Sequence, residues 1–249
     1  MSSPPRMPER LRAAVAADLR PVRALPPPSM RALWAVPLIG AVCAAAWLYF
    51  GVRRDAGELG LLLAWGPLVL QVTLGLALLA MALHETVPGL RPPRELVVVV
   101  VAAALTIHLA ANFLIWRRHP LGYGSFFASL WPCLRYEVML GAPFLIVIAL
   151  LALRALPMQP RVIGLLAGVG GGVIADASWR LVCPVSVPAH FLTAHLGGVV
   201  ALGAAGYLLG CLFERGGRPA AFNPETIGGA PAKVHTRRPD GRDRLSRKG

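Results

Sequence analysis

Residues 96–116 are LVVVVVAAALTIHLAANFLIW, a stretch without a single Lys, Arg, Asp or Glu. About 20 consecutive apolar residues are enough for an α-helix to cross the hydrocarbon core of a bilayer. An α-helix suits that environment because it pairs all of its backbone polar groups internally where no water is present. The stretch therefore predicts a membrane-spanning helix.

Five further apolar stretches of this kind flank residues 96–116. Their approximate bounds are 30–50, 59–83, 136–156, 162–182 and 191–213. The chain of 249 residues is 56% hydrophobic and 15% charged, whereas about a quarter of the residues in a soluble domain are charged. The sequence thus predicts an all-α integral membrane protein, a bundle of six transmembrane helices.

The basic residues predict how these spans are oriented. One side of the bundle is expected to carry only Arg53, Arg54, Arg117, Arg118, Arg135 and Arg180. The rest of the 25 Lys and Arg residues fall on the opposite side, which the positive-inside rule places in the cytoplasm. With an even number of spans, both termini are then cytoplasmic. The same rule accounts for the net charge of +13, so we expect no direct contact with nucleic acid.

Three parts of the chain follow from this topology. Residues 1–29 form a cytoplasmic N-terminal segment, residues 30–213 the transmembrane domain, and residues 214–249 a basic, disordered cytoplasmic tail. A short amphipathic helix is expected in the first part, because Leu11, Val15 and Leu19 recur at four-residue spacing. This helix could lie on the inner leaflet or offer its apolar stripe to a cytoplasmic partner.

The stretch RLVCPVSVPAHFLTAH, residues 180–195, carries a thiol and two imidazoles on the predicted outer side. Pro184 and Pro188 are expected to end one helix and to allow the next one to begin. Cys133 is predicted in the outward loop after the third span, on the same oxidising side as Cys183. The two cysteines could form a static disulfide, a functional thiol pair, or two unrelated thiols.

A metal site is a weaker interpretation of the same stretch. Cys183 with His190 is the more plausible pair of ligands, since thiolate and imidazole suit Zn or Cu. His190 and His195 would point about 140° apart on one α-helix, so a single helix would not easily offer both to one ion. Arg180 or a protonated His190 is expected to lower the pKa of Cys183.

Other polar and small residues fall inside the predicted spans. His108 and Asn112 share a helix face, as do Asp176 and Arg180, which predicts hydrogen bonds between helices and a local ion pair. A transporter would instead use these groups as a polar path. A row of glycines at four-residue spacing predicts close helix packing: Gly164, Gly168 and Gly172. No catalytic motif is present, so we predict that the chain is not an enzyme and needs no cofactor. A thiol-redox membrane enzyme is a less favoured alternative, because such enzymes use paired cysteines that this chain lacks.

Three stretches resemble one family of bacterial membrane proteins, the negative-regulator-of-sigma-F (NrsF-like) family. They are AADLRPVRALPPP, LWPCLRYEVMLGAPFLIVIALLALRALPMQPRVIGLLAGVGGGV and CPVSVPAHFLTAHLGG. The resemblance covers about residues 10–213, and it lies in the order and spacing of these pieces.

The resemblance implies an anti-sigma factor of the bacterial inner membrane. Such a protein holds an extracytoplasmic-function sigma factor at the cytoplasmic face and releases it on metal or oxidative stress. The family's two outward cysteines correspond to Cys133 and Cys183, which are therefore the expected sensor thiols. We expect the N-terminal helix to bind the sigma factor through these residues: Leu11, Val15, Leu19, Arg20 and Arg23. A small-solute or ion transporter is the alternative function.

Overall fold

A computed structural model describes residues 8–18, 25–118, 126–155 and 157–216. Within these ranges the regular elements are all helices, and they are α1 (Glu9–Asp18), α2 (Pro28–Ala32), α3 (Ala35–Phe50), α4 (Ala56–Ala64), α5 (Gly66–His84), α6 (Arg94–Arg118), α7 (Phe126–Leu153), α8 (Pro160–Arg180), α9 (Pro188–His190), the π-helical turn η1 (Phe191–His195) and α10 (Leu196–Gly216). Six segments are long and apolar enough to cross a membrane: Pro28–Phe50, Gly66–His84, Arg94–Arg118, Leu130–Leu153, Pro160–Arg180 and Pro188–Arg215. For the described residues, the prediction of an all-α chain is confirmed, and so is the prediction of six helices long and apolar enough to cross a membrane.

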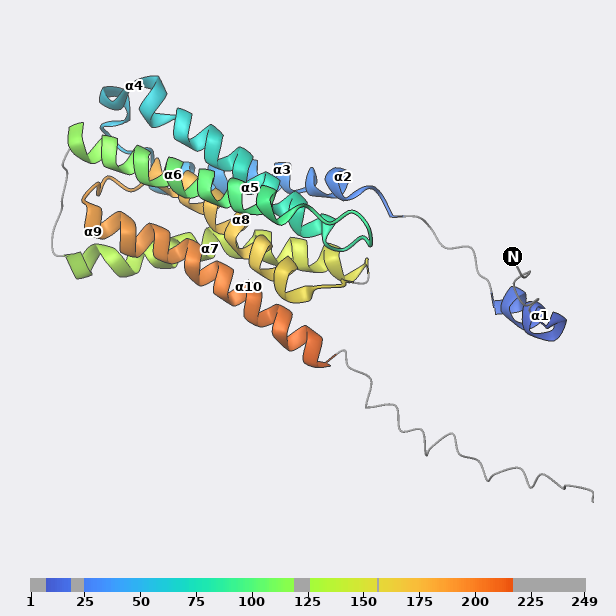
Figure 1. The fold of residues 1–249 in the computed structure, drawn as a ribbon. Coiled ribbons are helices and arrows are strands. Elements are labelled where there is room, and N and C mark those ends of the chain that lie inside the picture. Colours follow the sequence, from blue (N-terminus) through green and yellow to red (C-terminus); the bar gives the residue numbers. More distant parts are fainter. Residues whose placement is uncertain (1–7, 19–24, 119–125, 156, 217–249) are drawn as a thin grey trace, which may run out of the picture. The chain divides into compact units, whose positions relative to one another are not determined.

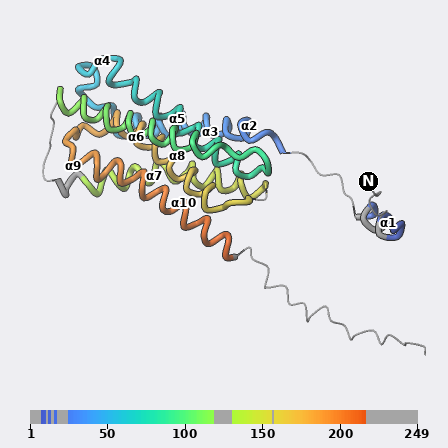
Figure 2. Tube along the Cα trace, viewed as in Figure 1, coloured from blue at the N-terminus to red at the C-terminus, as the bar shows by residue number. Residues whose placement is uncertain are grey.

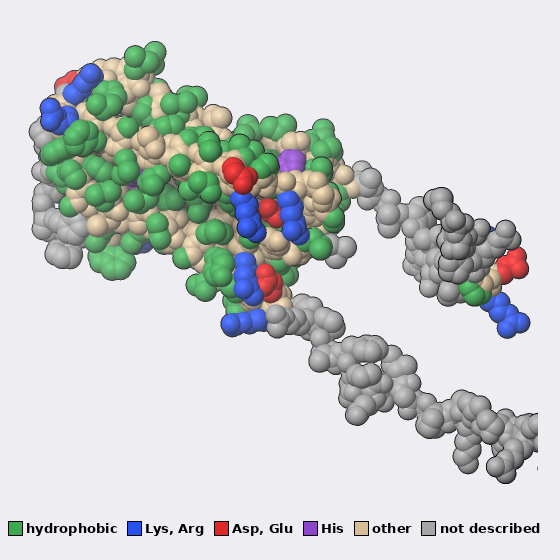
Figure 3. Space-filling view, viewed as in Figure 1, with side chains coloured by type: hydrophobic (Ala, Val, Ile, Leu, Met, Phe, Trp, Pro, Cys, Tyr) green, Lys and Arg blue, Asp and Glu red, His purple; other side chains and the backbone are tan. Residues whose placement is uncertain are grey.

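The long helices lie side by side in one bundle (Figures 1 and 2). On the face seen in Figure 3, charged side chains gather toward the two ends of the bundle, and hydrophobic side chains cover the surface between them. Large apolar side chains are exposed on the described helices, among them Leu48 at 87% and Leu62 at 84%. A surface of this kind suits contact with lipid rather than with water.

Helix α2 begins and helix α10 ends at the same end of the bundle, here called the basic end (Figure 1). Arg31 in α2 donates a hydrogen bond to the carbonyl of Leu151 near the end of α7. Arg161 at the start of α8 forms an ion pair with Glu214 near the end of α10. At the opposite end, the backbone N–H of Arg53 donates to the carbonyl of Leu181, 2.7 Å away, which joins the α3–α4 loop to the end of α8.

Helix α8 lies at the centre of the bundle. Within an 18-residue apolar stretch of α8, 78% of the residues are buried, against 28–50% in the corresponding stretches of the other five spans. The predicted glycine row explains the close packing: Gly164 and Gly168 lie against the backbone of Gly206 and Leu202 in α10, where a Cβ atom would overlap the facing carbonyls. Gly171, on another face, lies against Gly141 of α7. The prediction that this row serves helix packing is confirmed.

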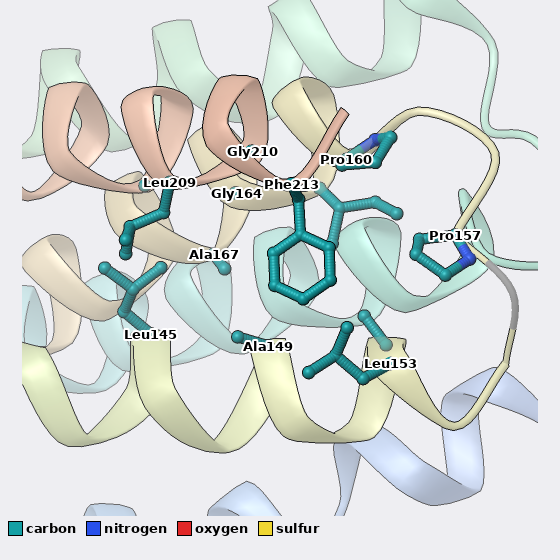
Figure 4. A pocket seen from close by; sticks show the side chains of 13 residues that line it. Leu145, Ala149, Leu153, Pro157, Pro160, Gly164, Ala167, Leu209, Gly210 and Phe213 are labelled. Carbon is teal, nitrogen blue, oxygen red and sulfur yellow. The ribbon is translucent and has the colours of Figure 1, made fainter. Parts of the chain in front are cut away.

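Toward the basic end, α7, α8 and α10 leave a cavity of about 140 Å³ between them. The side chains of Leu145, Leu209 and Phe213 surround it (Figure 4). Its lining is apolar throughout, so this cavity belongs to the hydrophobic packing and supplies no polar site.

Two predicted span boundaries differ from the structure. The stretch 59–83 is divided at Trp65 into α4 and α5, and Pro67 suits the first turn of the new helix. Within α4, Gly60 has a positive φ of 74°, which kinks that helix. The fourth span was predicted from residue 136, but α7 begins at Phe126 and continues through Pro132. The prediction that Cys133 lies in a loop is therefore wrong, because Cys133 belongs to α7.

The predicted N-terminal helix is present as α1, Glu9–Asp18. Leu11 and Val15 belong to α1, but their side chains lie outside the described residues, as do Leu19, Arg20 and Arg23 altogether. The predicted basic tail also lies outside them from residue 217 on.

Candidate thiol and histidine site

Two cysteines and two histidines meet at the end of the bundle opposite the basic end. Cys133 comes from α7, Cys183 from the loop after α8, and His190 and His195 from α9 and η1. One ligand atom of each residue lies within 4.8 Å of the others, and all four side chains are buried. The Sγ atoms of the two cysteines are 3.5 Å apart as free thiols, and Sγ of Cys183 is 3.4 Å from Nε2 of His190. We call these four residues the thiol–histidine site.

The local sequence explains how Cys183 reaches this place. Helix α8 ends at Arg180, and the N–H of Cys183 donates to the carbonyl of Trp179 at 2.8 Å, which closes the helix. Pro184 follows at once and cannot continue a helical ladder, whereas Pro188 starts α9, where a missing N–H costs nothing. The two prolines thus act as predicted.

The π-helical turn η1 explains why both histidines face the same site. The N–H of Leu196 donates to the carbonyl of Phe191, five residues earlier. Such a turn joins residues five apart by a hydrogen bond, and the rings of His190 and His195 are 5.3 Å apart between centroids. The expectation that the five-residue spacing would separate them is wrong, because it assumed α-helical geometry.

Two buried carboxylates hold His195 from its other side. Nδ1 of His195 lies 3.0 Å from Oδ1 of Asp176 and 3.2 Å from Oε1 of Glu137. Both carboxylates are 0% exposed. Gly198 in α10 leaves the space for Glu137, since a Cβ atom there would overlap the carboxylate. Glu137 was missed in the sequence, although it follows Cys133 by four residues and so shares its helix face.

Asp176 also joins several helices. Its Oδ2 accepts hydrogen bonds from Gln71 of α5 at 2.9 Å and from Arg180 at 2.8 Å, and it lies 2.8 Å from Nδ1 of His108 in α6. The predicted ion pair between Asp176 and Arg180 is confirmed. The prediction that His108 forms a hydrogen bond to another helix is also confirmed. Buried polar groups in a span pair with one another in this way.

The pKa of the Cys183 thiol is raised by its hydrogen bond to Cys133 and by its burial. The expectation that Arg180 would lower this pKa is wrong, because the Arg180 guanidinium is directed at Asp176. The aromatic side chains of Phe50, Tyr136 and Trp179 pack beside the cysteines, with ring centroids 4.7–5.0 Å apart. The thiols are therefore shielded, and a reagent or ion reaches them only when this packing opens.

At the basic end, Arg31 makes buried hydrogen bonds that were not predicted from the sequence. Its guanidinium donates to Oγ1 of Thr86 at 2.8 Å and to the carbonyl of Leu151 at 3.2 Å, and the residue is only 2% exposed. These groups lie at the ends of α5 and α7, where helix carbonyls lack partners within the helix. Arg31 thus ties the first residues of the transmembrane unit to two other spans.

A family model described as negative regulator of sigma F (NrsF) matches residues 15–215. The match includes the whole bundle and all four residues of the thiol–histidine site. Comparisons with curated proteins and with solved structures give no match.

Proposed function

Because the chain belongs to the negative-regulator-of-sigma-F family, which acts on a sigma factor, we propose that it is an anti-sigma factor of the bacterial inner membrane. It holds an extracytoplasmic-function sigma factor at the cytoplasmic face and releases it when Cys133 and Cys183 react on the outer face. The observation that carries the sensing step is the meeting of these two thiols, fifty residues apart in the chain and 3.5 Å apart in space.

The distribution of charge supports this orientation. Counted in the sequence, the N-terminal segment, the tail and the loops and helix ends on this side together hold 19 of the 25 Lys and Arg residues, against six on the opposite side. Basic residues next to a span favour the cytoplasmic side. The N-terminal segment and the tail then face the sigma factor, and the thiols face the oxidising compartment, where disulfides persist.

The chemistry of release needs only small movements at the thiols. A peroxide oxidises one thiol to a sulfenic acid and is itself reduced with loss of water. The second thiol then displaces hydroxide from that sulfur, forming the disulfide and a second water. An S–S bond is about 2.05 Å long, so the sulfur atoms, now 3.5 Å apart, need to approach by about 1.5 Å. This pulls the start of α7 toward the end of α8.

Helix α7 provides a link from the thiols to the basic end. Its 28 residues extend about 40 Å at 1.5 Å per residue, with Cys133 near one end and Leu151 near the other. Leu151 accepts a hydrogen bond from Arg31, which follows the N-terminal segment directly. A displacement of α7 therefore alters the anchor of that segment. A coupling free energy of about 1–3 kcal/mol is enough to change sigma-factor affinity 5- to 150-fold.

The N-terminal segment is the proposed binding surface for the sigma factor. Helix α1 begins with Glu9, and Arg10, Arg12 and other polar or small residues of this helix are exposed to solvent. Leu11, Val15, Leu19, Arg20 and Arg23 are the proposed contacts, since a narrow apolar stripe with flanking arginines suits a groove on an acidic partner.

A reporter transcribed by the sigma factor tests this function in cells. Cys133→Ser and Cys183→Ser should each keep basal repression and abolish induction by cadmium, chromate or peroxide. Cys43→Ser and Cys211→Ser are matched controls, because these cysteines lie outside the thiol–histidine site, and they should leave induction unchanged. Normal induction in a Cys133→Ser, Cys183→Ser double variant would contradict the sensing role.

A further inference from the structure

We propose that Cys133, Cys183, His190 and His195 form a complete four-ligand site for one tetrahedral, thiolate-preferring divalent cation such as Zn²⁺ or Cd²⁺. This inference rests on the proposed function, since it names the metal chemistry of the same sensor. It goes beyond the cysteine pair because it assigns both histidines as ligands and gives the two nearby carboxylates a role.

The distances within the site are those of a tetrahedral metal centre. With Zn–S bonds of about 2.3 Å and Zn–N bonds of about 2.0–2.1 Å, two sulfur ligands lie about 3.8 Å apart, and a sulfur and a nitrogen about 3.6 Å apart. The two observed separations are 3.5 Å between Sγ of Cys133 and Sγ of Cys183, and 3.4 Å between Sγ of Cys183 and Nε2 of His190. The other separations between ligand atoms are at most 4.8 Å, so these atoms need to move inward by at most about 1 Å to surround one ion.

The residue types select the class of cation. Two thiolates and two imidazoles favour Zn²⁺ and softer ions of similar geometry over Mg²⁺ or Ca²⁺, which take oxygen ligands. Binding is an exchange without redox change: one divalent cation displaces one proton from each thiol and bonds to both sulfurs and both imidazole nitrogens. The two thiolate charges neutralise the ion, which suits a site whose cysteines are only 8% and 4% exposed.

The surroundings of His195 match the outer shell of metal sites. A metal-bound histidine usually directs its second nitrogen to a carboxylate, which fixes its ring and tautomer. Nδ1 of His195 lies within 3.2 Å of both Asp176 and Glu137, which leaves Nε2 for the ion. Asp176 and Glu137 are therefore positioning residues that orient His195.

The site also explains the π-helical turn. Only the i+5 hydrogen bond of η1 brings His190 and His195 to one side of the chain, and such turns occur frequently at functional sites. Metal capture would join α7, the α8–α9 loop and η1 at one point. Disulfide formation would consume both thiolate ligands, so the oxidised and the metal-bound states exclude each other.

The test uses the purified, reduced full-length protein in lipid nanodiscs, with Co²⁺ as a spectroscopic probe. We expect one equivalent of Co²⁺ to give the intense ligand-field bands of a tetrahedral site and a thiolate-to-cobalt charge-transfer band, both lost when Zn²⁺ or Cd²⁺ is added. X-ray absorption of the Zn²⁺ form should show two sulfur and two nitrogen ligands. A six-coordinate spectrum, or no uptake at one equivalent, would overturn the proposal without any variant.

Variants assign the ligands. Cys133→Ser or Cys183→Ser should remove about half of the charge-transfer intensity, and His190→Gln or His195→Gln should weaken binding more than tenfold. Asp176→Asn should weaken it about 10- to 100-fold with the tetrahedral bands retained, as for other outer-shell residues. His84→Gln is the matched control, since His84 is the last residue of α5 and lies outside the thiol–histidine site. This variant should bind Co²⁺ as the wild-type protein does. Unchanged spectra in both histidine variants would contradict their assignment as ligands.

The outcomes separate this inference from the proposed function. A tetrahedral site in a protein that never retains a sigma factor would support the site and refute the function. Thiol-dependent release in a protein that takes up no Co²⁺ would support the function and refute the site.

Discussion

Replacing Arg31 with Met tests whether the basic end is held together by this one buried guanidinium. Methionine keeps the apolar stem and removes the charge and the donors. The lost contacts are those to Thr86 Oγ1 at 2.8 Å and the Leu151 carbonyl at 3.2 Å. Hydrogen bonds to charged groups contribute about 1.5–3 kcal/mol each. Part of this is offset because a buried charge no longer needs to be desolvated.

We therefore expect Arg31→Met to lower the free energy of unfolding by about 2–4 kcal/mol. Unfolding is measured in mixed detergent micelles, followed by the fluorescence of the native tryptophans. Thr86→Val should cost about 1.5–3 kcal/mol, because it removes a hydrogen bond to a charged group. The double variant should cost at least about 1 kcal/mol less than the sum, because the two groups bond to each other.

Arg91→Met is the matched control. It removes the same charge at the same end, but the Arg91 side chain is 45% exposed and lies 3.7 Å from Glu85, so it should cost at most about 0.5 kcal/mol. Equal losses in Arg31→Met and Arg91→Met, or additive losses in the double variant, would refute the role given to Arg31. In cells, Arg31→Met should also weaken induction by cadmium, because the link from α7 to the N-terminal segment is cut.

Three other predictions address the binding segment, the packing and the topology. Deleting residues 2–25 should abolish capture of the sigma factor in pull-downs from solubilised membranes and raise transcription of its targets; repression that persists would place the binding surface elsewhere. Gly168→Val should lower the free energy of unfolding by about 2–3 kcal/mol, because the new side chain would overlap Leu202. Gly40→Ala should have little effect, because nothing lies within 4 Å of the added Cβ atom. Equal effects of the two variants would contradict the close contact of α8 with α10. A thiol introduced at Ser3 should react with an impermeant maleimide only after the membrane is opened; labelling of intact cells would contradict the cytoplasmic N-terminus.

The spans could be predicted because each property that defines them is local. An apolar stretch is visible in the sequence alone, and residues 96–116 do form part of a long apolar helix. A row of glycines is equally visible, and Gly164, Gly168 and Gly172 do lie against a neighbouring helix. The start of α7 was missed because Pro132 lies inside a helix that tertiary packing sustains.

The thiol–histidine site was only half predictable. The resemblance pointed to Cys133 and Cys183, but the inclusion of His195 depends on a π-helical turn. No residue pattern marks that turn, because its stability comes from packing against α7 rather than from local propensity. Asp176 and Arg31 were visible as charges near predicted span ends, yet their partners lie on other helices, far apart in the sequence.

The affinity of the sigma factor for the protein in nanodiscs, measured in each thiol state, tests the central claim most directly. Affinity should be high with reduced thiols and should fall 5- to 150-fold, the range of a 1–3 kcal/mol coupling, after peroxide treatment or cadmium binding. A reductant or a chelator should restore it, and the Cys133→Ser, Cys183→Ser protein should bind equally tightly in all states. An identical dissociation constant for the reduced, oxidised and metal-treated wild-type protein would contradict the account.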